Sequence, residues 1–310
     1  MRKFSRLIAP ASLLIATLGL AGMSQAQELR IGTASLGGAF YPVGQAISNL
    51  VNEHAEGYTM VPVVTQGAAE NPRLLASGEV DIGIGNASTS FFAHKGEAPY
   101  ADAIDVRTLG TLHSSVLHIV TLADSYIKTI EDLKGARVAV GPAGGGTLNL
   151  LRDVLTAHGL GFDDITPSFL SYADGFSQLS DGSVDVSVAL SGYPAAAVIQ
   201  TSTTNDIAFL SISDDSMARI LEMFPFYSSK VLPSEVYGTQ EPTTLLGVQN
   251  ILITMGSMPD EQAYTLTKAI YGHLDEFAAE NANAKQISAK DAYTVAVPLH
   301  PGAKRFFDEQ

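Results

Sequence analysis

The sequence predicts an α/β fold made of two lobes, and three observations lead to it. Short apolar runs alternate with helical stretches along most of the chain, as in folds whose parallel sheets are covered by helices. Two glycine-rich turns, at residues 32–38 and 141–147, each follow such an apolar run. After each turn, a Gly-x-Val-Asp sequence opens a further apolar run, at residues 78–84 and 182–188.

The individual elements follow from the apolar runs and their spacing. Nearly continuous apolar runs indicate strands that helices cover on both faces. The C-terminal part carries one long amphipathic helix with Pro259 in its first turn. The predicted strands are residues 29–32, 60–65, 80–86, 106–112, 118–122, 137–141, 166–170, 184–190 and 207–212. The predicted helices are residues 43–53, 72–77, 148–158, 176–180, 194–200 and 259–279.

The repeated order of strand, glycine-rich turn, helix and Gly-x-Val-Asp strand indicates two related units. We assign residues 27–117 together with 212–310 to the first lobe, and residues 118–211 to the second, with hinge strands between them. Chance similarity of ordinary turn residues is the alternative, because glycine often precedes a strand. Ligands of open α/β sheets bind outside the carboxyl ends of the strands. We therefore expect a cleft between the lobes, lined by both glycine-rich turns.

Residues 1–26 have the pattern of a secretory signal. Three basic residues precede an apolar run over residues 7–20, and Ala26 follows as a small residue at the cleavage position. The run is shorter than the roughly 20 residues that span a bilayer, and an uncleaved N-terminal anchor is the alternative. The sequence thus predicts an exported chain that begins near Gln27.

Charge and cysteine content exclude several classes of function. Removal of the signal changes the net charge from −14 to −17, since that segment holds three basic residues and no acidic one. So acidic a chain is not expected to bind nucleic acid or anionic lipid. The absence of cysteine excludes disulfides, thiol nucleophiles and Cys-ligated zinc. An anionic ligand must then be held by local dipoles, because the overall field repels it.

The second glycine-rich turn is the strongest candidate for such a ligand contact. Gly144, Gly145, Gly146 and Thr147 precede a predicted helix. Glycines let several backbone N–H groups face one ligand, and a helix N-terminus adds about half a positive charge. The turn lacks the lysine of a nucleotide-binding P-loop. It therefore predicts a carboxylate or phosphate site, with a plain flexible turn as the alternative.

Uncharged polar residues at other predicted strand ends complete the candidate site. Tyr41 offers a hydroxyl to the ligand, with burial in the core as the alternative. Convergent uncharged groups in a cleft suit recognition of a small polar solute. The further predicted ligand contacts are Thr33, Ser35, Tyr41, Thr65, Asn86, Ser88, Ser191, Gly192, Tyr193 and Pro194.

The sequence offers no set of catalytic residues. There is no metal-binding histidine spacing and no Gly-x-Ser-x-Gly nucleophile elbow. His113 and His118 are interpreted as structural, although His113 is placed to reach the cleft. Asp81 and Asp185 stand at matching strand starts, away from the expected cleft, where turn or capping roles fit better than acid–base chemistry. We therefore predict a binding protein without catalytic residues, metal or cofactor.

Taken together, these residues resemble the TAXI proteins, the solute receptors of one branch of tripartite ATP-independent periplasmic (TRAP) transporters. The more specific matches are Gly32-Thr33 with Gly38-x-Phe40-Tyr41-Pro42, and His300-Pro301-Gly302-Ala303. The others are Thr65-x-Gly67-x-x-Glu70-Asn71, Asp132-Leu133-Lys134-Gly135-x-Arg137-Val138, Gly144-x-Gly146-Thr147, Asp181-Gly182-x-Val184-Asp185 and Gly192-x-Pro194. They cover nearly the whole chain after the signal.

The resemblance implies a monomeric periplasmic receptor with a type II-like, two-lobed periplasmic binding protein fold that closes by a hinge. It implies a small organic acid as ligand, such as a dicarboxylate, 2-oxoglutarate or glutamate, and TRAP permease subunits as the membrane partner. Gly145 and Ala68 stand where that family usually has serine, so two hydroxyl donors are missing. An ABC-type partner, a sensor role and an enzyme on the same fold are the alternatives.

Overall fold

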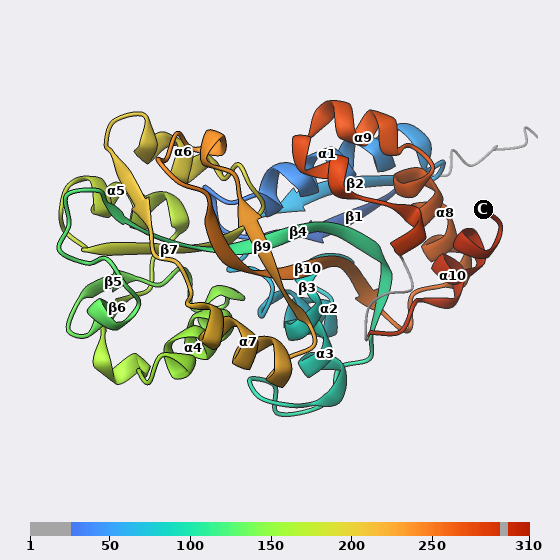
Figure 1. Ribbon diagram of the computed structural model, residues 1–310. Helices are drawn as coiled ribbons and strands as arrows, with labels where there is room; N and C mark the ends of the chain where they lie inside the picture. The colour runs from blue at the N-terminus through green and yellow to red at the C-terminus, as the bar shows by residue number, and fades with distance from the viewer. Residues whose placement is uncertain (1–25, 292–296) are drawn as a thin grey trace, which may run out of the picture.

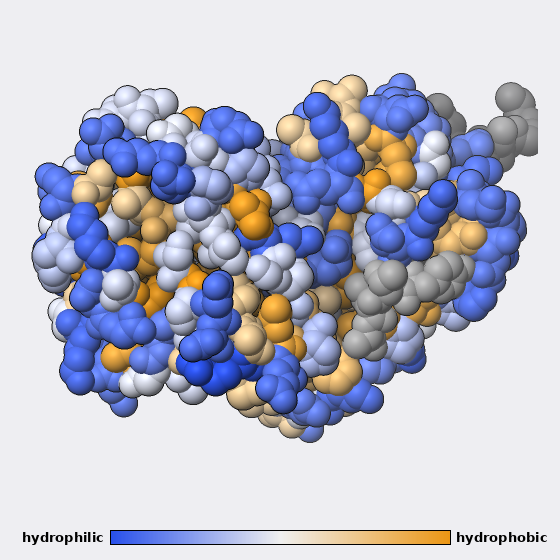
Figure 2. Space-filling model, viewed as in Figure 1, coloured by the Kyte–Doolittle hydropathy of each residue, from blue (hydrophilic) through white to orange (hydrophobic). Residues whose placement is uncertain are grey.

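The computed structural model describes residues 26–291 and 297–310, and the strands of these residues form one ten-stranded mixed sheet (Figure 1). The sheet runs through both halves of the molecule in the order β2-β1-β3-β10-β4-β7-β5-β6, with β8 beside β4 and β9 beside β10. The predicted signal segment, apart from Ala26, lies outside the described residues. Figure 2 shows a largely hydrophilic surface that is hollowed between the two halves.

The first half contains three parallel strands, each followed by a helix. The apolar positions of its first helix, Val43, Ile47, Leu50 and Val51, are three or four residues apart and all fully buried, so one face packs on the sheet. The strands are β1 (Gln27–Gly32), β2 (Tyr58–Val63) and β3 (Ile82–Asn86). The helices are α1 (Phe40–His54), α2 (Asn71–Ser77) and α3 (Ala87–Lys95).

The second half repeats this arrangement. Its parallel strands are β5 (Arg137–Ala139), β6 (Thr166–Ser168) and β7 (Val186–Ser191), with β5 in the middle as β1 is in the first half. The helices that follow them are α4 (Thr147–Ala157), α5 (Tyr172–Ser180) and α6 (Ala196–Ser202). The short strand β8 (Ile207–Phe209) and helix α7 (Asp214–Met223) come next.

Two long antiparallel strands join the halves. They are β4 (Val106–Leu122) and β10 (Thr243–Met255), with β9 (Tyr227–Leu232) on the outer part of β10. Residues 106–112 and 118–122, predicted as separate strands, belong to the single strand β4. The polar residues between them stay in the strand because they are covered: His113 and Ser115 are fully buried. Neither β9 nor β10 was predicted, and the antiparallel pairing of β4 and β10 with their neighbours makes the sheet mixed instead of parallel.

The C-terminal part packs against α1. Instead of one helix over residues 259–279, there are two, α8 (Asp260–Tyr271) and α9 (Leu274–Glu280), which are separated at Gly272. The last helix is α10 (Pro301–Asp308). Short 3₁₀ turns lie at Glu131–Leu133, Phe162–Asp164, Ser234–Val236, Ala282–Gln286 and Ala289–Asp291. None of the described helices is long and apolar enough to cross a membrane.

Separate apolar cores mark the two lobes. Along β4, Leu109 and Leu112 belong to the core under α1, whereas Leu117 and Ile119 belong to the core under α4. Helix α7 and strand β9 also contribute to the core under α4, through residues such as Ile220. The lobe boundaries at residues 117 and 212 stay predictions. From the packing of α7 and β9, we infer that the chain returns to the first lobe within β10, after residue 212.

Candidate functional site

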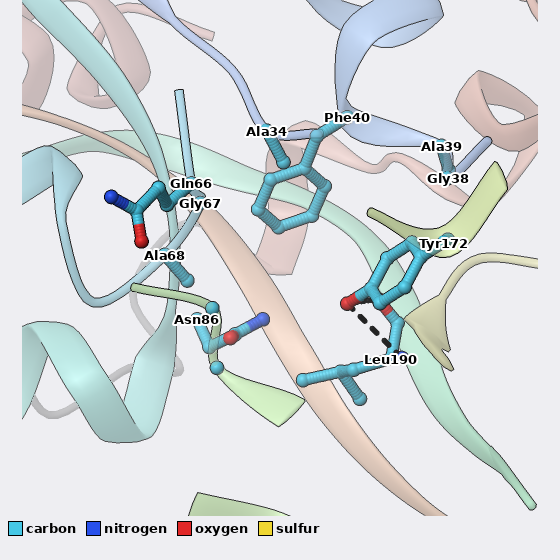
Figure 3. Close-up of a pocket in the computed structure, with 12 residues that line it drawn as sticks. Ala34, Gly38, Ala39, Phe40, Gln66, Gly67, Ala68, Asn86, Tyr172 and Leu190 are labelled. Carbon is cyan, nitrogen blue, oxygen red and sulfur yellow. Dashed lines mark hydrogen bonds between the residues drawn. The ribbon is translucent and has the colours of Figure 1, made fainter. Parts of the chain in front are cut away.

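A small cavity lies between the lobes, at the carboxyl ends of the strands (Figure 3). Its volume is about 10 Å³, roughly the room for one water molecule. In Figure 3, Phe40 and Tyr172 approach it from one side, and Asn86 and Leu190 approach it from the other. The lining residues are Ala34, Gly38, Ala39, Phe40, Gln66, Gly67, Ala68, Asn86, Gly145, Gly146, Tyr172 and Leu190.

Four helix N-termini converge on this cavity. Phe40 opens α1 and Tyr172 opens α5, while Asn86 and Gly146 are the N-cap residues of α3 and α4. Each helix N-terminus carries unsatisfied N–H groups and about half a positive charge. None of the lining residues has a charged side chain. The positive potential of the site therefore comes from backbone dipoles, which is the arrangement that binds small anions at helix N-termini.

The triple-glycine turn bridges the two lobes. The N–H of Gly144 donates to Oε1 of Gln66 (2.8 Å), and its carbonyl accepts from the N–H groups of Ala69 and Glu70 (3.1 Å each). A methyl group on Gly146 would lie 2.1 Å from Oδ1 of Asn86, too close for any side chain. A side chain at residue 146 would therefore require Asn86 to move for the lobes to approach this closely.

The first turn of α4 keeps donors for a ligand. Among the described residues, no protein acceptor takes the backbone N–H groups of Gly146 and Thr147. By contrast, the Gly145 N–H donates within the turn, to the carbonyl of Pro142 (2.9 Å). These two adjacent N–H groups lie beside the cavity. The contact between the glycine turn and an anion stays a prediction.

The hydroxyl of Thr147 is fully buried and bonded within the protein. It lies 2.6 Å from the hydroxyl of Tyr172. The Tyr172 hydroxyl in turn donates to the carbonyl of Leu190 and accepts from its N–H, both at 3.2 Å. Burial raises the pKa of Tyr172, so this ring stays uncharged. Since Tyr172 lines the cavity and Thr147 does not, the Thr147 side chain positions Tyr172 within the wall.

Thr33 and Thr65 brace the first glycine-rich turn behind the lining. The Thr33 hydroxyl donates to the carbonyl of Val63 (2.7 Å), and the Thr65 hydroxyl to Oδ1 of Asn71 (2.8 Å). The Asn71 amide donates to the carbonyls of Thr33 and Ile84 (2.8 Å each). All three polar side chains are buried, and their bonds join the ends of β1, β2 and β3.

Further hydrogen bonds hold the lobes together beside the cavity. The N–H of Ala39, at the start of α1, donates to the Ser191 hydroxyl at the end of β7 (2.9 Å). At the end of β3, the Asn86 amide donates to Asn250 of the joining strand β10 (2.7 Å), whose own amide donates to Ser115 of β4 (2.8 Å). The structure is thus the closed arrangement of the two lobes.

The predicted site residues divide into three groups. Asn86, Gly145 and Gly146 line the cavity; Gly144, Thr147, Thr33, Thr65 and Ser191 lie directly behind the lining; Ser35, Tyr41, Ser88, Gly192, Tyr193 and Pro194 lie outside it. Tyr41 is half-buried on α1, and Pro194 is exposed after a cis peptide bond. Their roles as ligand contacts stay predictions.

Several lining residues were not predicted as ligand contacts. The largest are Phe40 and Tyr172, each at a helix N-terminus. Their position after a strand was the available signal, because helix starts at this edge of a sheet face the ligand. Gln66 is polar, but its amide oxygen is engaged by the N–H of Gly144. The remaining ones are small or apolar, and nothing in their chemistry indicates a ligand: Ala34, Gly38, Ala39, Gly67, Ala68 and Leu190.

One group of metal-type side chains occurs among the described residues, away from the cavity. His54 of α1 lies 2.7 Å from Glu276 of α9, and its ring stacks on that of His273 at 3.6 Å and 3°. A histidine binds a metal in the plane of its ring, and parallel planes do not meet at one point. The three side chains therefore join α1 to α9. The prediction that the protein has no metal stays untested.

Comparison with protein-family models identifies the family. The model of the NMT1-like family matches residues 31–310. The chain belongs to the NMT1-like family. One curated relative is a putative aliphatic sulfonates-binding protein of Escherichia coli (strain K12). It is 29% identical to this NMT1-like protein over 205 residues. That match covers 64% of this chain and 60% of the relative, less than two thirds of its length.

Solved structures share the fold of this NMT1-like protein. PhnD1 from Prochlorococcus marinus, solved with methylphosphonate, superposes with a TM-score of 0.55 at 10% identity, covering 92% of this chain and 97% of that one. The binding protein component of an ABC phosphonate transporter from Pseudomonas aeruginosa gives 0.53 at 14% identity, covering 85% and 80%. The predicted two-lobed periplasmic binding protein fold of type II is confirmed.

The predicted TAXI family is wrong. The matching family is the NMT1-like family, and the curated relative is described as a sulfonates-binding protein. A TRAP permease as partner and glutamate or 2-oxoglutarate as ligand depended on that resemblance. The error has a physical source: glycine-rich turns and Asp-capped strands build the fold, and many binding proteins with different ligands and partners need them.

Proposed function

We propose that this NMT1-like protein is a periplasmic solute-binding receptor that captures a small sulfonate or phosphonate for an ABC-type permease. The observation that carries the proposal is the convergence of four helix N-termini on an interlobe cavity without charged lining residues. Such a site favours an anion whose charge is matched by backbone N–H groups. The alternative of an ABC-type binding protein thus replaces the TRAP interpretation.

The number of donors favours a tetrahedral head group. A sulfonate or phosphonate presents three acceptor oxygens, and a carboxylate presents two. The N-termini of α1 and α5 approach the cavity from one side, through Phe40 and Tyr172, and the N-terminus of α3 approaches it from the other, through Asn86. Three oxygens pointing apart are matched by donors from several directions better than two oxygens in one plane. The names of the E. coli relative and of the phosphonate-binding structures agree with this choice.

Capture requires the lobes to open. The cavity holds about 10 Å³, whereas ligand pockets measure roughly 300–1,000 Å³. Opening breaks the bonds of Gly144 to the 66–70 turn and of Ala39 to Ser191. The solute then binds between the lobes and replaces part of these bonds as the lobes close around it by hinge motion. A receptor of this kind binds and releases its solute without changing it.

Export and docking complete the proposed function. Residues 1–26 would direct the chain to the periplasm and be removed near Ala26. The surface charge of the exported chain is strongly negative, so capture relies on the local dipoles of the cleft. The closed form would then be the one that the permease recognises.

Calorimetric titration of refolded residues 27–310 tests the proposal. The panel holds ethanesulfonate, propanesulfonate, methylphosphonate, ethylphosphonate, glutamate, 2-oxoglutarate, sulfate and glucose. We expect selective binding of organic sulfonates or phosphonates, and a gain of about 2.7 kcal/mol in unfolding free energy at 100 times the dissociation constant. Tighter binding of glutamate, 2-oxoglutarate or glucose, or no binding across the panel, would contradict it.

A further inference from the structure

Buried polar atoms without partners gather next to the cavity. Among the described residues, these atoms include Oγ of Ser35, Oδ1 of Asn86, Oδ1 of Asn283 and both ring nitrogens of His113. A buried donor or acceptor without a partner destabilises the folded state, because its hydrogen bonds to water are lost and not replaced. Such groups are rare in folded proteins and are usually explained by water, an ion or a ligand.

Two of these residues, His113 and Asn283, lie side by side behind the cavity wall. A methyl group on Gly192 would lie 2.2 Å from Oδ1 of Asn283 and 2.7 Å from Cδ2 of His113. The His113 ring also meets the ring of Phe40 edge-on, with 6.1 Å between centroids. Phe40 also lines the cavity, so its ring contacts both the cavity and His113.

The orientation of Asn283 leaves an acceptor. Its amide nitrogen donates to Oδ1 of Asn281 (3.3 Å), which also accepts from the Asn283 backbone N–H (3.0 Å). These bonds determine which end of the amide is engaged, so that Oδ1 is the end without a partner. The side chain therefore accepts a hydrogen bond from whatever lies beside it.

His113 supplies a donor and a second acceptor. Its ring is fully buried, and burial lowers its pKa to about 4. The ring is therefore neutral at physiological pH, with one N–H and one nitrogen lone pair. No carboxylate of the described residues forms an ion pair or hydrogen bond with His113 or Asn283. A cationic group placed here would be buried without a counter-charge, which is costly.

We propose that His113 and Asn283 form a subsite for a hydroxyl group on the solute, at the far end from its anionic head. The inference depends on the proposed function and narrows its solute class to short hydroxyalkyl sulfonates or phosphonates. The hydroxyl donates to Oδ1 of Asn283 and accepts the N–H of His113. An unsubstituted alkyl chain leaves both side chains without partners, and an ammonium group adds an uncompensated charge.

Titration with matched solutes tests the subsite. We expect 2-hydroxyethanesulfonate to bind at least about tenfold more tightly than ethanesulfonate or 2-aminoethanesulfonate, because only the hydroxyl satisfies both side chains. The same comparison is made with the corresponding three-carbon sulfonates.

His113→Phe and Asn283→Leu should each abolish the preference and keep the affinity for ethanesulfonate within about threefold. Both variants should unfold at or above the wild-type temperature, since they remove buried polar atoms without partners. His94→Phe, on α3 outside the lining, is the control and should keep the preference.

The possible failures are distinct. Equal binding of the three sulfonates, or a preference that survives in His113→Phe and Asn283→Leu, would overturn the subsite and leave the proposed anion receptor intact. Tighter binding of 2-aminoethanesulfonate would overturn the choice of a hydroxyl. Absence of binding by every sulfonate and phosphonate would overturn the proposed function together with the subsite.

Discussion

Asp81 and Asp185 accept the same backbone hydrogen bond in the two lobes. Oδ2 of Asp81 accepts the backbone N–H of Arg30 at 2.8 Å, and Oδ2 of Asp185 accepts that of Arg137 at 2.8 Å. Each guanidinium also donates to the carbonyl of the glycine that opens its repeat, at 3.0 and 2.9 Å. The repeated Gly-x-Val-Asp sequence thus ties each central strand to its neighbour, and the predicted structural role of both carboxylates is confirmed.

Replacing Asp185 with asparagine should lower the free energy of unfolding by about 1–2 kcal/mol at pH 7. The contribution is modest because half of the Arg137 side chain is exposed. The hydrogen bonds of Arg137 lower the pKa of Asp185, so the folded state favours the carboxylate. The stabilisation is therefore complete above about pH 4 and lost as the pH falls through the lowered pKa. Urea denaturation at pH 7 and pH 2.5 measures the difference. Asp124→Asn, at an exposed position, is the control.

Gly146→Ala should weaken solute binding at least about tenfold, because its methyl group would meet Asn86 across the cleft. The clash occurs only when the lobes are closed, and the backbone of Gly146, at φ −69°, is open to alanine. The free protein should therefore unfold within a few degrees of wild type. Titration and thermal unfolding measure the two effects. Gly161→Ala, where no neighbour is closer than 4.0 Å, should alter neither, and unchanged affinity in Gly146→Ala would contradict the closed geometry.

Gln66→Leu should shift the free protein toward an open arrangement. The Gln66 side chain bonds the N–H of Gly144 across the cleft at 2.8 Å, and leucine cannot accept that bond. Small-angle X-ray scattering without solute should give a larger radius of gyration than wild type, and saturating solute should restore the compact form. Gln45→Leu, on the exposed side of α1, is the control. Gln249 is unsuitable for this purpose because it donates to a carbonyl within the hinge.

The stability of the protein should fall as the pH decreases from 7 to 5. Burial lowers the pKa of both His113 and His118 to about 4, whereas a histidine of the unfolded chain has a pKa near 6.5. Between these values the unfolded chain binds more protons, so the free energy of unfolding rises with pH. Each ring should contribute about 2 kcal/mol between pH 5 and pH 7. Denaturation of His113→Phe should show a smaller pH dependence than wild type by about the contribution of one ring, and an unchanged slope would contradict the burial of a neutral ring.

The strands and helices of each lobe were largely predictable, because their signals lie in neighbouring residues. The apolar spacing of α1 and the strand that Gly-x-Val-Asp opens are examples, and both appear in the structure. The continuity of β4 was not predictable. His113 and Ser115 interrupt its apolar pattern, and only the cover from both lobes keeps these polar residues within the strand.

The candidate site was predicted in part. Gly145 and Gly146 line the cavity. Their position was predictable because a glycine-rich turn before a helix is typical of an anion-binding turn at that edge of a sheet. Thr33 and Thr65 have the same strand-end position, but their hydroxyls are bonded to the backbone of β2 and to Asn71. Local sequence does not reveal which polar groups are already engaged.

By itself, the sequence determined the two α/β halves, their internal repeat and the glycine turn that lines the cavity, since these depend on local periodicity and on backbone freedom. The tertiary structure alone decided which side chains meet between the lobes. Asn86 meets Gly146, and His113 lies beside Asn283, because two hinge strands bring distant parts of the chain into one closed space. Such contacts depend on the path of the whole chain, and no segment carries them alone.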